Sequence, residues 1–160
     1  EKPQENIEGD SEERSDLYDL MHLEESIVRF GPEPECRVIY EQEKESKSIL
    51  YRYSWLKERG IKPENARRFK VTEESMEPLL FSDDSVLVNI AETDIQNRKV
   101  YALRYRDELR FRRVLKKLNG SLLLQSENPR FFDEEINLDE VNRHITIIGR
   151  VRGKFGSGGL

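Results

Sequence analysis

Cysteine, histidine and long apolar runs are scarce in this chain of 160 residues. The single cysteine, Cys36, has no second cysteine with which to form an internal disulfide. The two histidines, His22 and His144, lie far apart, so the chain lacks a Cys/His cluster with metal-ligand spacing, and we expect neither a metal nor a cofactor. No stretch approaches the ~18 apolar residues that a membrane span requires. The acidic N-terminus does not resemble a signal peptide, so we expect a cytoplasmic protein without a membrane partner.

Charge is plentiful but unevenly distributed. Charged residues make up 37% of the chain and hydrophobic residues 36%, with a net charge of -5. Residues 1–26 hold ten acidic and two basic side chains, which gives -8, so the other residues carry +3. Nine basic residues fall between Arg98 and Lys117. They indicate either a solvated strand face or a nucleic-acid patch, although no recognisable DNA-reading module accompanies them.

Both ends of the chain differ in composition from its middle. Residues 1–14 are almost all polar and cannot bury enough surface to offset the cost of ordering. Apolar residues at helical spacing predict a short helix over 15–25, so residues 1–26 are expected to form a flexible acidic arm. Residues 153–160 are glycine-rich and are expected to be a mobile tail. One core domain, residues 27–152, remains between the arm and the tail.

The core domain has the pattern of a mainly β protein. Two β-rich runs around residues 27–30 and 36–40 are separated by a glycine and two prolines, which predicts extended segments joined by a loop. A short helix is expected from Ser54, as its N-cap, to Gly60. Further apolar runs at sheet-like spacing predict strands at Val86, Val100, Leu109, Leu122 and Ile145.

The stretch with the clearest chemical meaning runs from Thr72 to Leu80, Thr-Glu-Glu-Ser-Met-Glu-Pro-Leu-Leu, and leads into an acidic turn and an apolar strand at 86–88. This pattern places the hydroxyl of Ser75 on a bend at the mouth of a sheet, where a nucleophile would sit. It resembles the Gly-Asp-Ser-Met-x-Pro signature of the LexA-like, family S24 proteins, which include SOS and phage repressors and UmuD-like proteins.

The resemblance extends over roughly residues 69–152. The segments 94–103, 107–114, 122–131 and 145–151 match further family landmarks in order and rough spacing. Residues 49–60, with Ser-Trp-Leu before Gly60, resemble a segment of phage-type repressors. The resemblance implies a LexA/signal-peptidase-like β-rich fold with one short helix before the core.

Two departures from the family affect its serine chemistry. In the family a lysine removes the proton of the serine, but the alignment of 107–114 places Arg112 at that position. A guanidinium stays charged where a buried lysine becomes neutral, so the base is lost and Ser75 is expected to hydrogen-bond locally with Arg112. Recruiting Lys116 or Lys117 instead would require the strand to slide by four or five residues. Glu73 and Glu74 also replace the Gly-Asp of the signature.

The segment that would be cut departs as well. The family presents an Ala-Gly or Cys-Gly bond to the serine, and the nearest counterpart here is Cys36-Arg37. An arginine adds a long charged side chain where the family's backbone approaches the serine closely.

These features favour the C-terminal oligomerisation and regulatory domain of a LexA- or CI-like transcriptional repressor that does not cleave itself. The expected partners are a second copy of the chain, operator DNA through an N-terminal helix-turn-helix unit that this chain lacks, and RecA or an antirepressor. The segment 145–151 is expected to support the dimer. The alternative is a RecA-stimulated self-cleaving serine peptidase, either a repressor or a UmuD-like protein.

Overall fold

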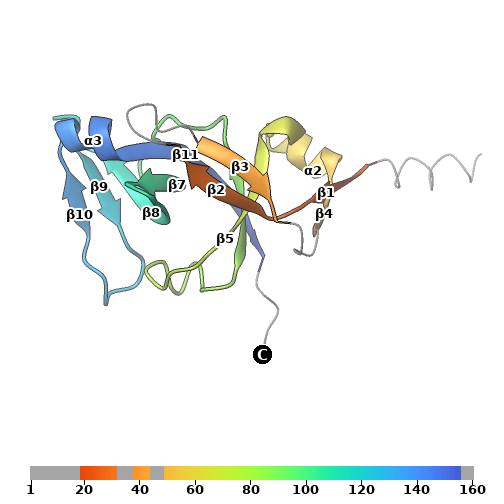
Figure 1. The fold of residues 1–160 in the computed structure, drawn as a ribbon, viewed down its shortest axis with the longest axis horizontal. Helices are drawn as coiled ribbons and strands as arrows, with labels where there is room; N and C mark the ends of the chain where they lie inside the picture. The colour runs from red at the N-terminus through yellow and green to blue at the C-terminus, as the bar shows by residue number, and fades with distance from the viewer. Residues whose placement is uncertain (1–18, 32–37, 44–48, 156–160) are drawn as a thin grey trace, which may run out of the picture.

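The computed structural model describes residues 19–31, 38–43 and 49–155, and antiparallel strands dominate it (Figure 1). The mainly β fold class predicted from the sequence is therefore confirmed. In chain order the elements are β1 (Leu20–Leu23), β2 (Ser26–Phe30), β3 (Val38–Gln42), β4 (Ile49–Arg52), α2 (Tyr53–Glu58), a 3-10 turn (Pro63–Asn65), β5 (Ala66–Lys70), β6 (Ser85–Asn89), β7 (Lys99–Tyr105), β8 (Glu108–Lys116), β9 (Leu122–Gln125), β10 (Glu134–Ile136), α3 (Leu138–His144) and β11 (Ile145–Phe155).

Seven strands form the main sheet in the order β10-β9-β8-β7-β11-β6-β5. The five predicted strands are β6, β7, β8, β9 and β11 of this sheet. The long β11 pairs with β7 from Ile145 to Arg150 and with β6 from Arg150 to Phe155, with a register shift in each ladder. A single strand therefore connects the two halves of the sheet.

The core lies against the middle of this sheet. All five residues of β6 are buried, the apolar Val86, Leu87 and Val88 together with the polar Ser85 and Asn89 at its two ends. Phe69 of β5, Phe111 of β8 and Met76 of the serine turn belong to the same buried cluster. Packing of Met76 into that cluster fixes the residue next to Ser75, so the core holds the turn that carries the candidate site.

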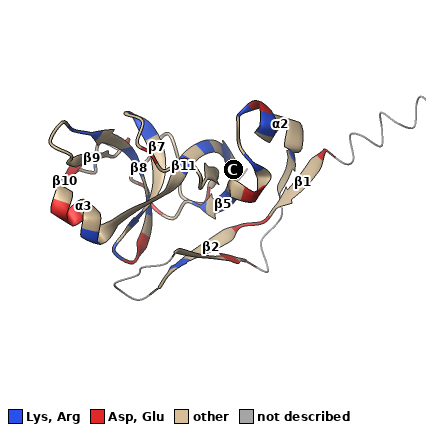
Figure 2. Cartoon of the chain, turned by 90° about the horizontal axis from the view of Figure 1, so that it is seen from above, with Lys and Arg blue, Asp and Glu red and all other residues tan. Residues whose placement is uncertain are grey.

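Two smaller ladders flank the main sheet. The predicted extended segments around 27–30 and 36–40 are confirmed over the residues that the structure describes, 27–30 and 38–40, since β2 and β3 pair in antiparallel register from Ser26–Gln42 to Phe30–Val38. The other ladder, β1 with β4, lies at the opposite end of the molecule from β9, β10 and α3 (Figures 1 and 2).

The prediction of a helix over 15–25 is wrong for the residues that the structure describes. Residues Leu20 to Leu23 form β1, which pairs with β4. Leu23 is buried beside Tyr51 and Leu56. Three apolar residues could support only a short helix, whereas pairing with β4 satisfies the backbone and buries Leu23. Residues 1–18 lie outside the described part of the chain, so the flexibility predicted for them stays a prediction.

The predicted helix before the core is confirmed as α2, but its cap differs. The helix begins at Tyr53, and the Ser54 side chain makes no capping hydrogen bond. Asp19 accepts hydrogen bonds from Ser54 N at 3.1 Å and from Ser54 Oγ at 2.6 Å. These hydrogen bonds lower the pKa of the Asp19 carboxyl. The helix ends before Gly60, whose φ of +68° suits a glycine.

The C-terminal boundary also differs from the prediction. Gly153 to Phe155 continue β11 and pair with β6, so the described part of the predicted tail is strand. Phe155 lies edge-to-face against Tyr51, with ring centroids 5.0 Å apart. The sequence also did not predict α3, which is capped by the Asn137 side chain accepting from Glu140 N at 2.9 Å. No helix in the described residues is long and apolar enough to cross a membrane.

Candidate functional site

Ser75 lies on the turn between β5 and β6 and is fully buried. The two ends of this turn are joined by hydrogen bonds from Val71 N to Asp84 O and from Asp83 N to Val71 O, both at 2.8 Å. Within it, Leu80 N donates to Met76 O at 2.9 Å, and the Glu77–Pro78 peptide is cis. The turn is thus a closed loop that projects the serine toward β8.

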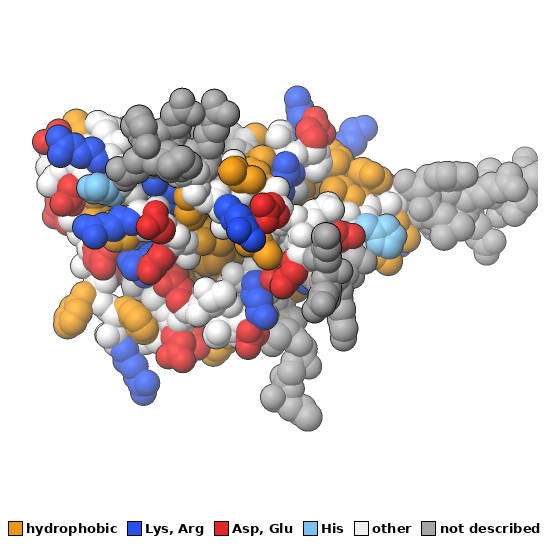
Figure 3. Space-filling model, viewed as in Figure 1, with side chains coloured by type: hydrophobic (Ala, Val, Ile, Leu, Met, Phe, Trp, Pro, Cys, Tyr) orange, Lys and Arg blue, Asp and Glu red, His pale blue; other side chains and the backbone are white. Residues whose placement is uncertain are grey.

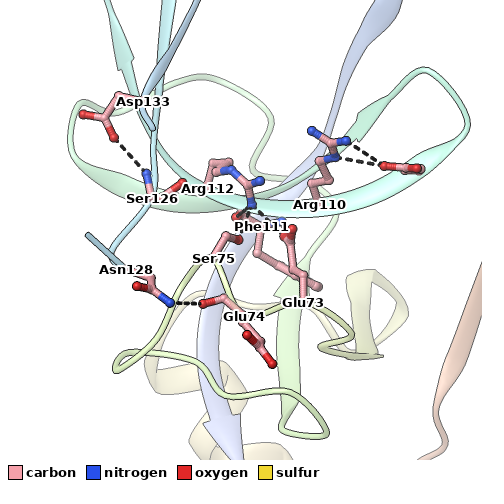
Figure 4. A network of polar contacts seen from close by, with 10 residues as sticks. Glu73, Glu74, Ser75, Arg110, Phe111, Arg112, Ser126, Asn128 and Asp133 are labelled. Atoms are coloured by element: carbon pink, nitrogen blue, oxygen red, sulfur yellow. Dashed lines mark hydrogen bonds and ion pairs between the residues drawn. The ribbon is translucent and has the colours of Figure 1, made fainter. Parts of the chain in front are cut away.

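Asn128, in the loop after β9, holds the turn from the other side. Its backbone N donates to Ser75 O and its Nδ2 donates to Glu74 O, each at 2.9 Å (Figure 4). Two hydrogen bonds from one residue fix the backbone carbonyls on both sides of the Ser75 Cα. Asn128 therefore positions the serine, although the sequence indicated only that its segment resembles a family landmark.

Arg112 of β8 contacts the Ser75 hydroxyl directly. Its Nη1 donates to Ser75 Oγ at 2.6 Å, to Glu73 Oε1 at 2.6 Å and to Phe111 O at 2.7 Å (Figure 4). Arg112 is 7% exposed, and Glu73 supplies the opposite charge that a buried guanidinium requires. The structure thus brings together Ser75 and Arg112, the two site residues that sequence analysis paired.

The chemistry of this contact follows from which hydrogen-bond donors and acceptors the two groups have. A guanidinium carries only donors and keeps its charge under all ordinary conditions, so it cannot take a proton from a hydroxyl. Here the serine oxygen accepts a hydrogen bond from Arg112. Such a bond withdraws electron density from the oxygen, the reverse of what a general base does for a nucleophile.

The two lysines considered as substitute bases lie at the end of β8 and just after it. Lys117 Nζ pairs with Glu135 Oε2 at 2.8 Å. Lys116 is exposed at the end of the strand, four residues beyond Arg112, a separation of about 13 Å at the usual strand rise. Among the described residues, Arg112 is the side-chain hydrogen-bond partner of Ser75, and neither lysine shares that contact.

A cleft of about 770 Å³ opens beside the serine turn. Figure 3 shows the mixture of side chains on one face of the molecule, with hydrophobic groups deep in a hollow and acidic and basic groups around them. The cleft is bordered by β2, the end of β5 and the first half of β8. Its lining includes the apolar residues Ile27, Val28, Leu109 and Phe131, the acidic residues Glu25, Glu43, Glu73, Glu108 and Glu134, and the basic residues Lys70, Arg110 and Arg112.

Glu73 is the member of the site that sequence reasoning misjudged. Its replacement of a family glycine indicated only a disturbance of the turn. In the structure its carboxylate binds Arg112 and also accepts from Phe111 N at 3.0 Å. Glu74 lies in a bend and Ser75 in a turn, so the alternation of side chains along a strand could not have placed Glu73 with Ser75. The predicted counterpart of the cleavage site, Cys36 and Arg37, lies outside the described residues.

Comparison with known proteins places this fold and site in a family. The family model described as Peptidase S24-like matches residues 32–152, more than half of the chain. The chain therefore belongs to the Peptidase S24-like family, which confirms the LexA-like resemblance. A curated relative is the HTH-type transcriptional regulator PrtR of Pseudomonas aeruginosa, 31% identical over 112 residues that make up 69% of this chain. The match spans 44% of the relative's length, less than half of that protein.

Proposed function

We propose that this chain is the C-terminal regulatory and self-association domain of a LexA- or CI-like transcriptional repressor and that it does not cleave itself. The observation that carries the second part is the hydrogen bond from Arg112 Nη1 to Ser75 Oγ at 2.6 Å. A guanidinium at the base position leaves the family's nucleophile without a proton acceptor.

The repressor role is supported by the relative whose name describes an HTH-type transcriptional regulator. In this proposal a cytoplasmic repressor binds operator DNA through a helix-turn-helix unit N-terminal to this domain. Two such domains pair so that two units reach two half-sites, because dimer symmetry matches operator symmetry. RecA or an antirepressor is the proposed regulatory partner.

Part of the segment 145–151 supports its expected role in self-association. Ile145 and Ile148 of this segment are buried in the core, whereas Val151 is partly buried. Val151 lines a shallow groove beside the second half of β11, together with Leu79 and Val100, and this groove offers apolar surface for pairing. We expect a dimer at micromolar concentration in sedimentation equilibrium, and a clean monomer would contradict the self-association role.

The absence of cleavage is tested by mass spectrometry after incubation at about pH 10, near the pKa of an ordinary lysine. The unmodified chain should stay intact because Arg112 keeps its proton. Arg112→Lys restores a base, but we expect cutting only when Arg37→Gly is added, since a glycine then follows Cys36. Serine-dependent cutting of the unmodified chain, abolished in Ser75→Ala, would establish the self-cleaving alternative.

A further inference from the structure

A groove of about 350 Å³ lies beside the second half of β11, on the surface proposed above for self-association. Its apolar lining consists of Leu79, Leu80, Val100 and Val151. Leu80 is buried and the other three are partly buried, so these side chains form a floor and do not project into solvent. Such a floor can cover aliphatic side chains of a binding partner and remove them from water.

Four basic side chains line the same groove. They are Lys99 at the start of β7, Arg113 on β8, and Arg150 and Lys154 on β11, whereas none of the described residues in the lining is acidic. The cleft beside the serine turn differs, because its lining holds five glutamates. We call the groove with these four cations the basic groove.

The two lysines of the basic groove have no carboxylate of their own. Lys154 Nζ donates to the backbone oxygen of Leu79 at 2.8 Å, and Lys99 is exposed. Within the described part of the chain, neither lysine has an ion-pair partner. A ligand with carboxylates can therefore supply the charges that these lysines lack.

The two arginines are only partly compensated. Arg113 pairs with Glu127. Arg150 lies 3.6 Å from Glu92, but the same carboxylate contacts Arg152 more closely, at 2.7 Å. Two carboxylates thus serve three arginines, and the basic groove keeps an excess of positive charge.

This charge opposes the pairing of two identical copies through the basic groove. In a symmetric dimer the same surface of each copy faces the other, so groove-to-groove contact brings together four basic side chains from each copy. Like charges that face each other across an interface reduce affinity. The apolar floor favours pairing and the cations oppose it, so a ligand that also neutralises the cations has an advantage over a second copy.

The apolar floor favours an acidic protein segment over nucleic acid as that ligand. A phosphate backbone is bound through basic and polar groups, and it has no aliphatic side chains to bury on the floor. The described lining contains no aromatic side chain on which a base could stack. Aliphatic side chains flanked by glutamates or aspartates match both the floor and the cations.

We propose that the basic groove binds an acidic, aliphatic segment of a regulatory partner protein and that this segment competes with self-association. The inference rests on the proposed function, because the groove is the surface proposed there for pairing. The aliphatic side chains contact Leu79, Val100 and Val151, and the carboxylates pair with Lys99 and Lys154. Since the segment binds only where the groove is open, it shifts the chain from dimer to monomer.

The probe is a fluorescent, end-blocked peptide, Glu-Glu-Leu-Val-Leu-Glu-Glu, whose binding to the full chain is followed by fluorescence anisotropy. One control, Lys-Lys-Leu-Val-Leu-Lys-Lys, keeps the aliphatic centre, and the other, Glu-Glu-Ser-Thr-Ser-Glu-Glu, keeps the charge. We expect the probe to bind, to weaken with added salt and to shift the backbone amide signals of Val100 and Val151 in NMR spectra. Each control should bind about tenfold more weakly. Equal binding by either control would overturn the proposal.

The variant Lys99→Glu tests whether the peptide binds in the basic groove. Lys99 is exposed, so reversing its charge should leave the fold intact, and we expect peptide affinity to fall about tenfold. The matched control is Lys116→Glu, which makes the same change of charge at an exposed position outside the lining of the groove. Equal losses in the two variants, at equal folded content by circular dichroism, would show that the peptide responds only to net charge and would overturn the proposal.

The competition is tested by sedimentation equilibrium with and without the probe peptide. We expect the glutamate peptide to shift the dimer toward monomer and the lysine control to leave the dimer unchanged. A dimer that persists with the peptide bound would overturn the competition. A dimer to which no peptide binds would overturn this inference and support the proposed self-association, whereas a clean monomer that binds the peptide would contradict self-association and support the basic groove as a binding site.

Two other occupants of the basic groove would give different results. Residues 1–18 hold seven acidic and two basic side chains, so they also match the charge of the groove. We expect Glu12→Gln/Glu13→Gln to leave peptide affinity unchanged, and tighter binding would show that these residues fill the groove and would overturn the foreign partner. Displacement of the peptide by a short DNA duplex at equal concentration would overturn it in favour of nucleic acid.

Discussion

Two buried arginines, Arg68 on β5 and Arg112 on β8, are held by the same kinds of groups. Arg112 donates to the carboxylate of Glu73, the hydroxyl of Ser75 and a backbone oxygen. Arg68 donates to the hydroxyl of Ser85 at 3.2 Å and to Leu23 O at 3.2 Å, and it pairs with Glu25 at 3.5 Å. In each case one guanidinium joins a glutamate, a serine and a main-chain carbonyl.

The similarity between the Arg68 and Arg112 contacts indicates what role Ser75 has in this chain. Arg68 ties β5 to Leu23 of β1 and to Glu25, which forms a bridge with Arg68, so its role is to fasten the N-terminal ladders to the main sheet. Ser85 has no nucleophile signature, yet its hydroxyl accepts a hydrogen bond from Arg68 just as the hydroxyl of Ser75 accepts one from Arg112. The arrangement at the family's catalytic position is therefore one that this chain also uses for plain structural support.

Arg68→Met should cause the largest loss of stability among these substitutions. It removes an ion-pair partner of Glu25, whose side chain is 13% exposed, and a hydrogen-bond donor to Ser85 Oγ and Leu23 O. Losing one partner of a buried ion pair costs about 3–5 kcal/mol, and the free energy of unfolding in urea would show this loss. Arg67→Met, a change in the next residue, is the matched control and should cost under about 1 kcal/mol. Equal losses in the two variants would contradict the role of Arg68.

Arg112→Met should cost less, about 1–3 kcal/mol in the same urea experiment, because Glu73 is 24% exposed and can turn toward water. A double-mutant cycle with Glu73→Gln isolates the coupling of the pair, which we expect within about 0.5–3 kcal/mol. The control cycle uses Arg110 and Glu108, a more exposed pair on the same strand, with an expected coupling below about 1 kcal/mol. If the two cycles gave equal couplings, the Glu73–Arg112 pair would be an ordinary surface pair.

The sequence predicted the main sheet better than its surroundings, for a physical reason. The short apolar runs of β6 and β7, rich in β-branched or aromatic side chains and bounded by polar residues, favour buried strands. Residues 20–23 contain too few apolar side chains to distinguish period two from helical spacing, and only the distant pairing with β4 decided between them. The helix α3 depends on the Asn137 cap and buries no residue, so it left no apolar stripe to recognise.

The site was predictable where residue type alone decides the chemistry. Arginine in place of lysine at 112 predicts a charged donor toward Ser75, and the structure has that contact. The contribution of Glu73 depends on how the turn brings it to β8, 38 positions away from Phe111. Such a contact follows from tertiary packing, which local sequence does not encode.

Tyr51→Phe should stabilise the N-terminal end of the molecule. Among the described residues, the Tyr51 hydroxyl is the one buried side-chain polar group without a hydrogen-bond partner. Burial raises the pKa of this hydroxyl, so it stays neutral and gains nothing from ionisation. Removing an unsatisfied buried hydroxyl should add about 1 kcal/mol of stability, or about 3 °C in Tm. Tyr53→Phe, at a 40% exposed position, is the control and should leave Tm unchanged.

The smallest effect concerns the carboxyls of Glu25 and Glu43, at the base of the β2–β3 hairpin. Glu43 N donates to Glu25 O at 2.9 Å, so the two residues lie side by side. Burial and then the charge of Glu43 raise the pKa of Glu25 above its ordinary 4.5, while Arg68 and Lys70 oppose the shift. A raised carboxyl pKa means that the folded chain holds this proton more tightly than the unfolded chain does. The stability that it contributes is therefore full below the ordinary pKa and is lost as the pH rises through the raised one.

Glu43→Gln removes the like charge and keeps Arg68 beside Glu25, so it should lower the pKa of Glu25. The loss of stability as the pH rises should therefore be smaller in this variant. Relative to the unmodified chain, the variant should gain more Tm at about pH 7 than at about pH 4, because the repulsion between two carboxyls weakens as the pH falls toward their ordinary pKa. Glu41→Gln is the control, because Glu41 is exposed and pairs with Arg29 instead of Glu25. A Tm difference for Glu43→Gln that is the same at both pH values would mean that the charge of Glu43 does not raise the pKa of Glu25.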